Sequence, residues 1–249
     1  MSAPHLSIVI PAYNESQRLP RTLGRVRGWL LASGASHEIV VVDDGSTDGT
    51  SEAAREAGED GLVLLRHERN RGKGYAVRRG MLAASGRRRL MTDADLSTPI
   101  EELARLEEEL GRGADVAIGS RAVSGARIEV RQTFAREATG RVFNALVQAL
   151  LLPGLQDTQC GFKLFTDEAA TLAFSATRLD GFSFDVEALY VARRRGLRIA
   201  EVPVVWRNDA ASRVSLAGGG AAFVDLFRIR LLALRGAYGP RAVEASSLT

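Results

Sequence analysis

The sequence LSIVIPAYNE at residues 6–15 decides the fold. Its apolar, β-branched part, residues 6–10, predicts a buried strand that Pro11 ends. Apolar residues then recur at helical spacing from Leu19 to Leu30, which predicts a helix directly after the strand. A strand followed by a helix is the repeating unit of a parallel α/β sheet.

The same unit repeats outward to about residue 120. The expected strands are 39–42, 62–65, 90–92 and 116–118, and the expected helices between them are 51–57, 74–84 and 101–110. Short, continuous apolar strands joined by helices indicate an α/β fold with a mostly parallel sheet covered on both faces.

The regular alternation of strands and helices changes after residue 119. Further helices are expected at about 133–152, 184–194 and 221–234. A strand at 199–205 contains Pro203, which favours the edge of a sheet. The stretch 156–165 has no clear period, so no element is expected there.

The composition excludes several classes of protein. Of the 249 residues 45% are hydrophobic and 25% charged, which is typical of a folded globular domain and excludes a disordered chain. The net charge of +3 is too small to indicate a nucleic-acid partner. The single cysteine, Cys160, excludes an internal disulfide framework and favours a reducing compartment. No apolar run reaches the roughly 18 residues of a membrane-spanning helix, and residues 1–5 do not read as a signal peptide.

Three neighbouring strands are expected to end in carboxylates. Glu15 follows the first strand, Asp43 and Asp44 follow the second, and Asp93 and Asp95 follow the strand that comes after the third helix. Ligands of open α/β sheets bind beyond the carboxyl ends of the strands, and such crowded negative charge needs a cation or hydrogen-bond donors. Asp93 and Asp95 therefore indicate a Mg²⁺ site shared with the phosphates of a nucleotide diphosphate. Two turn-forming aspartates are the alternative.

Three familiar motifs are incomplete. The stretch 44–55 imitates a calcium-binding loop, but its twelfth position is Arg55 instead of glutamate. The sequence Gly72-Lys73-Gly74 continues to Val77, where a dinucleotide-binding fingerprint needs glycine or alanine. No phosphate-binding P-loop is present either, so redox and P-loop chemistry lose support.

Four blocks together resemble the inverting family 2 glycosyltransferases with the GT-A fold. They are VIPAYNE at 9–15, VVDDGSTD at 41–48, NRGKG at 70–74 and DAD at 93–95. Later blocks extend the resemblance to about residue 235 and are similar to the dolichyl-phosphate β-glucosyltransferase branch. These are DTQCGFKLF at 157–165, FDVEALY at 184–190, and Trp206 with SRV at 212–214.

The resemblance implies a GT-A domain over residues 1–215. A Rossmann-like nucleotide-sugar-binding half at 1–120 precedes an acceptor half at 121–215. A C-terminal amphipathic helix at 216–238 and a tail at 239–249 are expected after it.

The resemblance also implies the residues of the donor site. They are Pro11, Tyr13 and Glu15, with Asp43 or Asp44, for uracil and ribose, Lys73 beside the nucleotide, and Asp93 and Asp95 for sugar and metal–diphosphate. Asp185 stands where the family often has a catalytic carboxylate.

The implied reaction transfers glucose from UDP-glucose to a polyprenyl monophosphate in one inverting displacement, with Mg²⁺ or Mn²⁺ stabilising the leaving diphosphate. The acceptor phosphate has a second pKa of about 6 and is largely ionised at neutral pH, so it barely needs a general base. Asp185 is equally well interpreted as orienting the sugar or a cationic side chain, or as an acid at a helix start.

Cations are expected to position the acceptor phosphate. All basic residues except Lys73 and Lys163 are arginines, which form forked bonds to phosphate. The candidates are Arg121, Arg131, Arg136, Lys163 and Arg213. Arg131 and Arg213 are the preferred candidates, and with Asp95 and Asp185 they are the expected catalytic residues. The alternative for any single arginine is a solvated surface residue, and codon bias is another reason for a high arginine content.

The last helix carries an apolar stripe. Phe223, Phe227, Leu231 and Leu234 share one side, with arginines nearby. Such a stripe packs on the core or lies at an anionic lipid surface, and the helix at 142–152 is a second candidate for lipid contact. Eukaryotic members of the family begin with a spanning segment that this sequence does not show. A bacterial protein is expected, cytoplasmic and in transient contact with the inner face of the plasma membrane.

Three other functions stay open. A GDP-mannose-dependent polyprenyl-phosphate mannosyltransferase shares the early blocks, and the stretch 96–99 leaves the donor sugar open. A sugar-phosphate nucleotidylyltransferase has a glycine-rich, arginine-bearing loop where this chain has residues 12–15. A non-catalytic nucleotide-sugar-binding module is the third.

Overall fold

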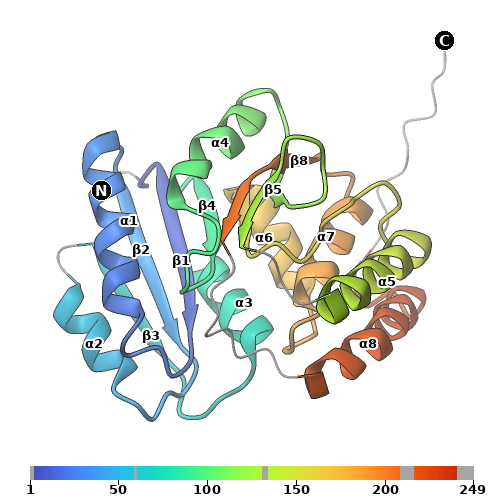
Figure 1. Ribbon diagram of the computed structural model, residues 1–249, viewed down its shortest axis with the longest axis horizontal. Helices are drawn as coiled ribbons and strands as arrows, with labels where there is room; N and C mark the ends of the chain where they lie inside the picture. The colour runs from blue at the N-terminus through green and yellow to red at the C-terminus, as the bar shows by residue number, and fades with distance from the viewer. Residues whose placement is uncertain (1–2, 59–60, 131–133, 208–215, 240–249) are drawn as a thin grey trace.

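A seven-stranded sheet runs through the molecule between two layers of helices (Figure 1). The computed structural model describes residues 3–58, 61–130, 134–207 and 216–239. Its strands are β1 (Leu6–Ala12), β2 (His37–Asp43), β3 (Leu62–Arg66), β4 (Arg88–Thr92), β5 (Val116–Ser120), β6 (Arg127–Val130), β7 (Phe162–Thr166), β8 (Ile199–Pro203) and β9 (Val205–Arg207). Its α-helices are α1 (Leu19–Ser33), α2 (Thr50–Ala57), α3 (Lys73–Ala83), α4 (Leu103–Gly111), α5 (Phe134–Leu150), α6 (Asp167–Ala176), α7 (Phe184–Arg194) and α8 (Leu216–Leu234), and a short 3₁₀ turn (Ile100–Glu102) precedes α4.

The strand β1 lies inside the sheet and is buried along its whole length. It pairs in parallel with β2 on one side and β4 on the other. Leu6, Ile8 and Ile10 pack in one apolar cluster and Val9 in the other, so both faces of the strand are apolar. This explains why the sequence of β1 is a continuous apolar run and does not alternate.

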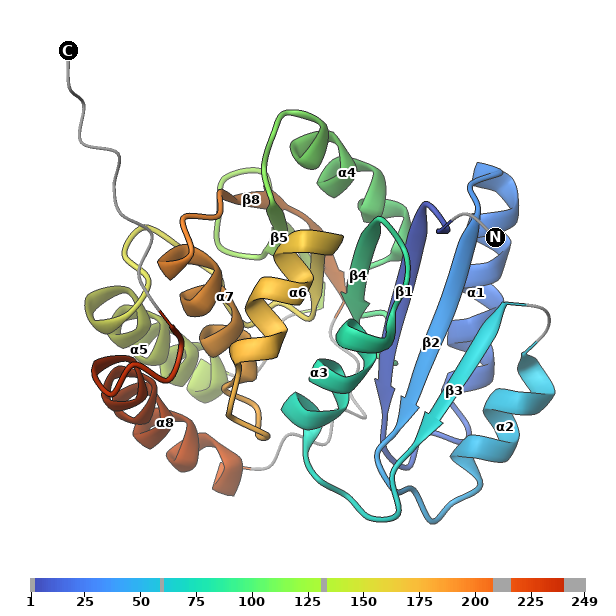
Figure 2. The same cartoon turned by 180° about the vertical axis from the view of Figure 1, so that it is seen from behind.

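The helices divide between the two faces of the sheet. Helices α1, α2 and α4 pack on one face, around Leu23 and Leu106. Helices α3, α6 and α7 cover the opposite face, and α5 and α8 continue that layer at one end of the molecule (Figure 2). The predicted α/β fold with a mostly parallel sheet is confirmed.

The strand order is β3-β2-β1-β4-β7-β5-β8, and β7 runs antiparallel to both of its neighbours. Neither β7 nor the following α6 is expected from the sequence. The reason for β7 is that Lys163, a charged residue, interrupts its short apolar run. The antiparallel direction has a structural consequence, because Phe162 at the start of β7 pairs with Thr92 at the end of β4. The residues before β7 therefore reach the same edge of the sheet as the residues after β4.

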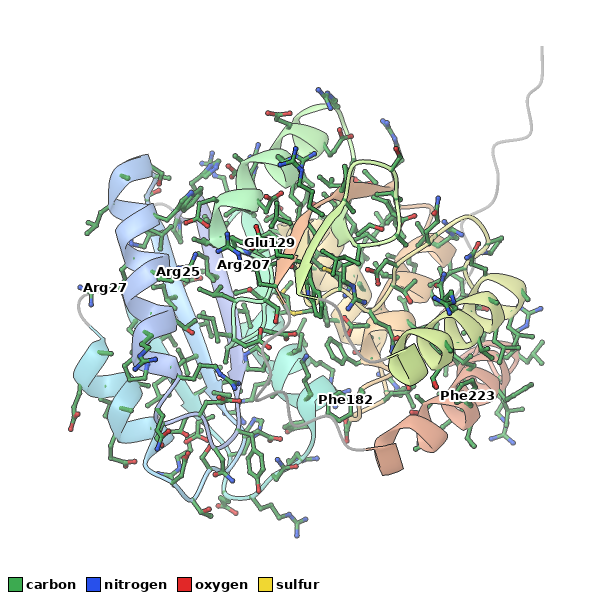
Figure 3. All side chains as sticks on the ribbon, in the orientation of Figure 1. Arg25, Arg27, Glu129, Phe182, Arg207 and Phe223 are labelled. Atoms are coloured by element: carbon green, nitrogen blue, oxygen red, sulfur yellow. The ribbon has the colours of Figure 1, made fainter. Side chains whose placement is uncertain are left out.

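The C-terminal part contains one confirmed expectation and two differences. The strand with Pro203 is β8, at the edge of the sheet as predicted. The small parallel β6–β9 pair is not expected from the sequence, and Glu129 lies 2.6 Å from Arg207 across it (Figure 3). In α8 the predicted stripe is wrong at one position, because Phe223 turns toward α5 and packs edge-on against Phe143.

Candidate active site

Hydrogen bonds join the loops after β1 and β2 into one surface. The backbone N–H of Asn14 donates to Ser46 Oγ over 2.8 Å, and the N–H of Thr47 donates to Asn14 Oδ1 over 3.0 Å. The N–H of Glu15 donates to Thr50 Oγ1 over 2.8 Å. Asn14 has a φ of 55°, a left-handed conformation that asparagine tolerates better than most residues. The first two sequence blocks thus meet beyond the carboxyl ends of their strands.

The other residues expected on this surface differ in their access to a ligand. Tyr13 is exposed, whereas Pro11 is buried within β1. The carboxylate of Glu15 lies 3.0 Å from the guanidinium of Arg18. A contact of these three residues with uracil or ribose stays a prediction.

Asp43 and Asp44 are buried, and hydrogen bonds already occupy their carboxylates. Asp43 accepts from the N–H of Ser46 over 2.8 Å and from the Ser51 hydroxyl. Asp44 Oδ1 lies 2.6 Å from His67 Nδ1. The structure therefore gives both aspartates a part in holding loops.

Asp44 also fixes the loop that leads into α3. Its carboxylate accepts from the N–H of Arg71 over 3.0 Å and of Gly72 over 2.8 Å. His67, to which no role was assigned from the sequence, directly follows β3 and shares the Asp44 carboxylate. A position immediately after a strand is the signal that could have identified this histidine.

Lys73 stands at the start of α3 and faces the end of β4. Its Nζ lies 2.7 Å from Asp93 Oδ1. Burial alone would lower the pKa of Lys73, but the charges of Asp93, Asp185 and Asp95 outweigh it and raise that pKa above its usual value. The ammonium group therefore stays charged at neutral pH.

Asp95 turns away from β4 into a strained loop. Its Oδ1 accepts a hydrogen bond from the N–H of Ser97 over 2.8 Å. Leu96 between them has a φ of 46°, an uncommon conformation for leucine that is found where a site over-determines the backbone. Burial and the adjacent Asp93 charge raise the pKa of Asp95 above its usual value. This carboxylate would gain from a nearby cation.

Two glycines let the loops approach this close. A Cβ on Gly161 would lie 2.0 Å from Asp93 Oδ2, so no side chain fits at that position. Gly72 has a φ of +102°, and a Cβ there would lie 2.3 Å from the carbonyl oxygen of Asp180. The glycines of the sequence blocks around Lys73 and Lys163 are thus required by packing.

Asp185 and Lys163 form a buried pair beneath the site. Lys163 Nζ lies 2.5 Å from Asp185 Oδ1 and also donates to the carbonyl oxygen of Cys160 over 2.5 Å. Burial raises the pKa of Asp185, while the charges of Lys163 and Lys73 act in the opposite direction. Lys163 is only 1% exposed. The expectation that Lys163 contacts the acceptor phosphate conflicts with this burial, because its ammonium group has no open side.

Arg121 follows β5 and forks onto Asp157. Arg121 Nε and Nη2 lie 2.7 and 2.9 Å from the two Asp157 oxygens, and the guanidinium stacks 5.3 Å from the Trp206 ring. Burial would raise the pKa of Asp157, but Arg121 outweighs it and lowers that pKa. Burial, and after it the Asp157 charge, raise the pKa of Cys160 to about 11, so its thiol is protonated at neutral pH. The Asp185 charge contributes to raising the pKa of Arg121, but the direct contacts of its guanidinium are with Asp157 and Trp206.

A buried carboxylate that the sequence did not indicate supports the Lys73 side of the site. Glu187 accepts from the N–H of Leu179 over 2.8 Å and from the hydroxyl of Tyr238 over 2.7 Å. The loop that it holds presents the carbonyl oxygen of Asp180 to the N–H of Gly74, 2.8 Å away. Glu187 stands two residues after Asp185 in the FDVEALY block, which could have identified it.

Three expected acceptor residues cannot be placed. Arg131 and Arg213 lie outside the described residues, and Arg136 belongs to α5, but its side chain is outside the described part. Their roles stay predictions.

Asp93 and Asp95 fit a divalent ion that takes its other ligands from substrate and water. Within the described residues no group of three or more histidine, cysteine or acidic side chains could hold a metal. Mg²⁺ is usually held by one or two carboxylates plus substrate phosphates, and Asp95 carries charge that a cation would relieve. In the part of the chain that the structure describes, no helix is both long and apolar enough to cross a bilayer.

Similar proteins fall into one family. The family described as Glycosyl transferase family 2 matches residues 7–171. The dolichyl-phosphate beta-glucosyltransferase of Homo sapiens is 36% identical over 94% of this chain and 77% of its own length. The enzyme of the same name from Mus musculus is 37% identical over 97% of this chain and 80% of its own length.

Solved structures agree on the fold. Mannosyl-3-phosphoglycerate synthase from Rubrobacter xylanophilus has a TM-score of 0.72 at 19% identity and covers 98% of this chain and 78% of its own. Glucosyl-3-phosphoglycerate synthase from Mycobacterium tuberculosis, in complex with Mn²⁺ and UDP-glucose, has a TM-score of 0.65 at 21% identity and covers 96% and 81%. At these identities the likeness concerns the GT-A fold alone. Because the match to the family extends over most of the sheet and over both sides of the site, the chain belongs to glycosyl transferase family 2.

Proposed function

We propose that this glycosyltransferase moves glucose from UDP-glucose to a polyprenyl monophosphate, giving polyprenyl-phosphate β-glucose and UDP. The observation that carries the proposal is the cluster of Asp93, Asp95, Lys73 and Asp185 at the carboxyl end of the sheet. The names of relatives similar over nearly the whole chain support the choice of donor and acceptor.

The donor diphosphate would lie against the Lys73 side of the site. Asp93 and Asp95 would hold a Mg²⁺ or Mn²⁺ ion, which supplies positive charge to the departing diphosphate. Lys73 adds a second positive charge there, because its side chain remains 26% exposed beside Asp93. A fixed cation is most effective where negative charge develops in the transition state.

The displacement needs no proton transfer from the acceptor. An ionised phosphate oxygen of the lipid attacks the anomeric carbon, the bond from that carbon to the diphosphate oxygen breaks, and the electron pair leaves with UDP. Asp185 is turned toward Lys163 and is buried, which supports a role in positioning more than one as a base. Arg131, Arg136 and Arg213 remain the proposed partners of the acceptor phosphate.

The lipid acceptor also determines where the enzyme acts. A polyprenyl phosphate resides in a bilayer, so we infer that the enzyme acts at a membrane surface, which we take to be the inner face of a bacterial plasma membrane.

The test measures radiolabel extracted into organic solvent after incubation with polyprenyl phosphate. Labelled UDP-glucose with Mg²⁺ is expected to give a labelled lipid, and EDTA is expected to abolish it. Asp95→Asn should reduce the rate by about 100-fold or more, the effect of removing one group that stabilises the leaving charge. Preferred turnover of GDP-mannose would replace the proposed donor, and full activity of Asp95→Asn would refute the proposed metal site.

A further inference from the structure

The outer face of α8 exposes an apolar stripe. Val224, Phe227, Leu231 and Leu234 are 67%, 63%, 45% and 80% exposed. Their spacing of three, four and three residues keeps them on one side of the helix. Large apolar side chains exposed singly need no explanation, but four in one line indicate a contact surface.

Arginines border this stripe on both sides. At 100° per residue, Arg228 and Arg235 fall along one border and Arg230 along the other, and all three are exposed. The one carboxylate of α8, Asp225, is half-buried and lies away from the stripe. We call Val224, Phe227, Leu231 and Leu234 with these three arginines the α8 face.

A different set of residues holds α8 on the protein. Leu226, Ile229 and Ala233 are buried in the cluster that includes Phe143 of α5. The Tyr238 hydroxyl, just after the helix, donates to Glu187 over 2.7 Å. The α8 face therefore contributes little to folding, and its exposure needs another partner.

We propose that the α8 face docks on an anionic bilayer surface. Apolar side chains of such a helix enter the boundary between headgroups and acyl chains, and flanking arginines pair with lipid phosphates. A second copy of the chain fits the face less well, because a two-fold contact would bring arginines against arginines with no exposed carboxylate between them. The proposal deepens the proposed function by naming the surface that meets the lipid.

The position of α8 agrees with this role. The first turn of α8 lies beside the loop between α6 and α7 in both views (Figures 1 and 2). Phe182 on that loop is exposed, and Figure 3 shows its side chain on the side of the loop drawn toward α8. Strands β1 and β2 end at the same edge of the molecule (Figure 1). A bilayer at this edge would meet the α8 face and the opening of the site together.

The test is flotation of the full chain with vesicles in the absence of any substrate. Vesicles of phosphatidylcholine with about 30% phosphatidylglycerol are compared with pure phosphatidylcholine. Phe227→Gln with Leu231→Gln should lower the bound fraction about tenfold or more. Arg228→Gln with Arg235→Gln should lower binding to the anionic vesicles about 20-fold, with little change on the neutral ones.

Matched controls come from α1, at the far end of the molecule. Leu31→Gln removes an equally exposed apolar residue and Arg25→Gln an exposed arginine, and neither should change flotation. Unchanged thermal unfolding of all variants confirms that they fold.

Two results would overturn the docking proposal. One is flotation that is absent in the wild type or is unchanged by the α8 variants. The other is a concentration-dependent dimer that the Phe227→Gln, Leu231→Gln variant abolishes. Glucose transfer to a short-chain, water-soluble prenyl phosphate without vesicles should be equal in all these variants. If the wild type floats with the vesicles but does not transfer glucose to the soluble acceptor, the proposed function is refuted and the docking proposal is not.

Discussion

The two lysines of the chain form similar ion pairs in different surroundings. Lys73 lies 2.7 Å from Asp93 with 26% of its side chain exposed, whereas Lys163 lies 2.5 Å from Asp185 with only 2% exposed. A charged group in a partly exposed pair can exchange its partner for a ligand. A buried pair cannot, because breaking it leaves an uncompensated charge. The same chemistry thus gives one lysine that a ligand can reach and one that is enclosed in the protein.

The largest effect is expected from breaking the buried pair. Lys163→Met leaves Asp185 buried without its partner, which should cost about 3 kcal/mol or more of unfolding free energy. Urea denaturation measures this loss. The double variant Lys163→Met, Asp185→Leu should recover much of the stability without recovering glucose transfer. A single variant as stable as the wild type would contradict the supporting role.

Breaking the partly exposed Lys73–Asp93 pair should affect catalysis more than stability. Lys73→Met is expected to lower kcat/KM for UDP-glucose about 100-fold, since it removes the charge that we propose stabilises the diphosphate. The unfolding free energy should change less than it does for Lys163→Met, because the Lys73–Asp93 pair is partly exposed. Steady-state kinetics and urea denaturation of the same preparation separate the effect on catalysis from the effect on stability. A large loss of stability with normal kinetics would show that Lys73, and not only Lys163, has a structural role.

The Arg121–Asp157 pair gives a test by pH. The pKa of Asp157 is lower in the folded state than its ordinary value of 3.8. The stabilisation by the ionised Asp157 is therefore fully present above pH 3.8 and is lost as the pH falls through the lower, folded-state pKa. Asp157→Asn should cost about 2 kcal/mol at pH 6. The difference from the wild type should shrink steadily below pH 3.8. Unfolding curves from pH 6 to pH 2.5 check this, and a constant difference would argue against ionic stabilisation.

The smallest effect is expected from the support of the Lys73 loop. Tyr238→Phe removes one hydrogen bond to Glu187 and should cost about 1.5 kcal/mol. A modest rise in KM for UDP-glucose is expected as well, because Glu187 holds the loop that contacts the start of α3. Tyr190→Phe is the matched control, since no hydrogen bond of its hydroxyl is described. If Tyr238→Phe and Tyr190→Phe change stability and KM equally, Glu187 does not support the Lys73 loop through Tyr238.

Much of the fold can be read from the sequence, because continuous apolar strands and spaced apolar helices leave a local signal. The first four strands and the helices between them follow it. The strand β7 does not, since its lysine is buried only through a distant aspartate. Local patterns cannot show such a partner.

The site follows the same division. Carboxylates at strand ends point to Asp93 and Asp95, which the structure brings beside Lys73. Whether a charged residue faces a ligand or lies beneath the surface depends on tertiary packing. The expectation for Lys163 fails for this reason, and Glu187 was missed because its partners come from other parts of the chain.

The antiparallel β7 also has a consequence for synthesis on the ribosome. Among the strands that the structure describes, β5 joins the sheet through β7 and β8 alone, and β7 is the one strand paired with the outer edge of β4. At about 5–20 residues per second, roughly 4–15 s pass between the emergence of β4 and that of β7. During this interval the nascent four-strand sheet carries an open edge, which other chains could pair with. We therefore expect truncated chains that end between residues 92 and 166 to depend on chaperones more strongly than the full-length chain does.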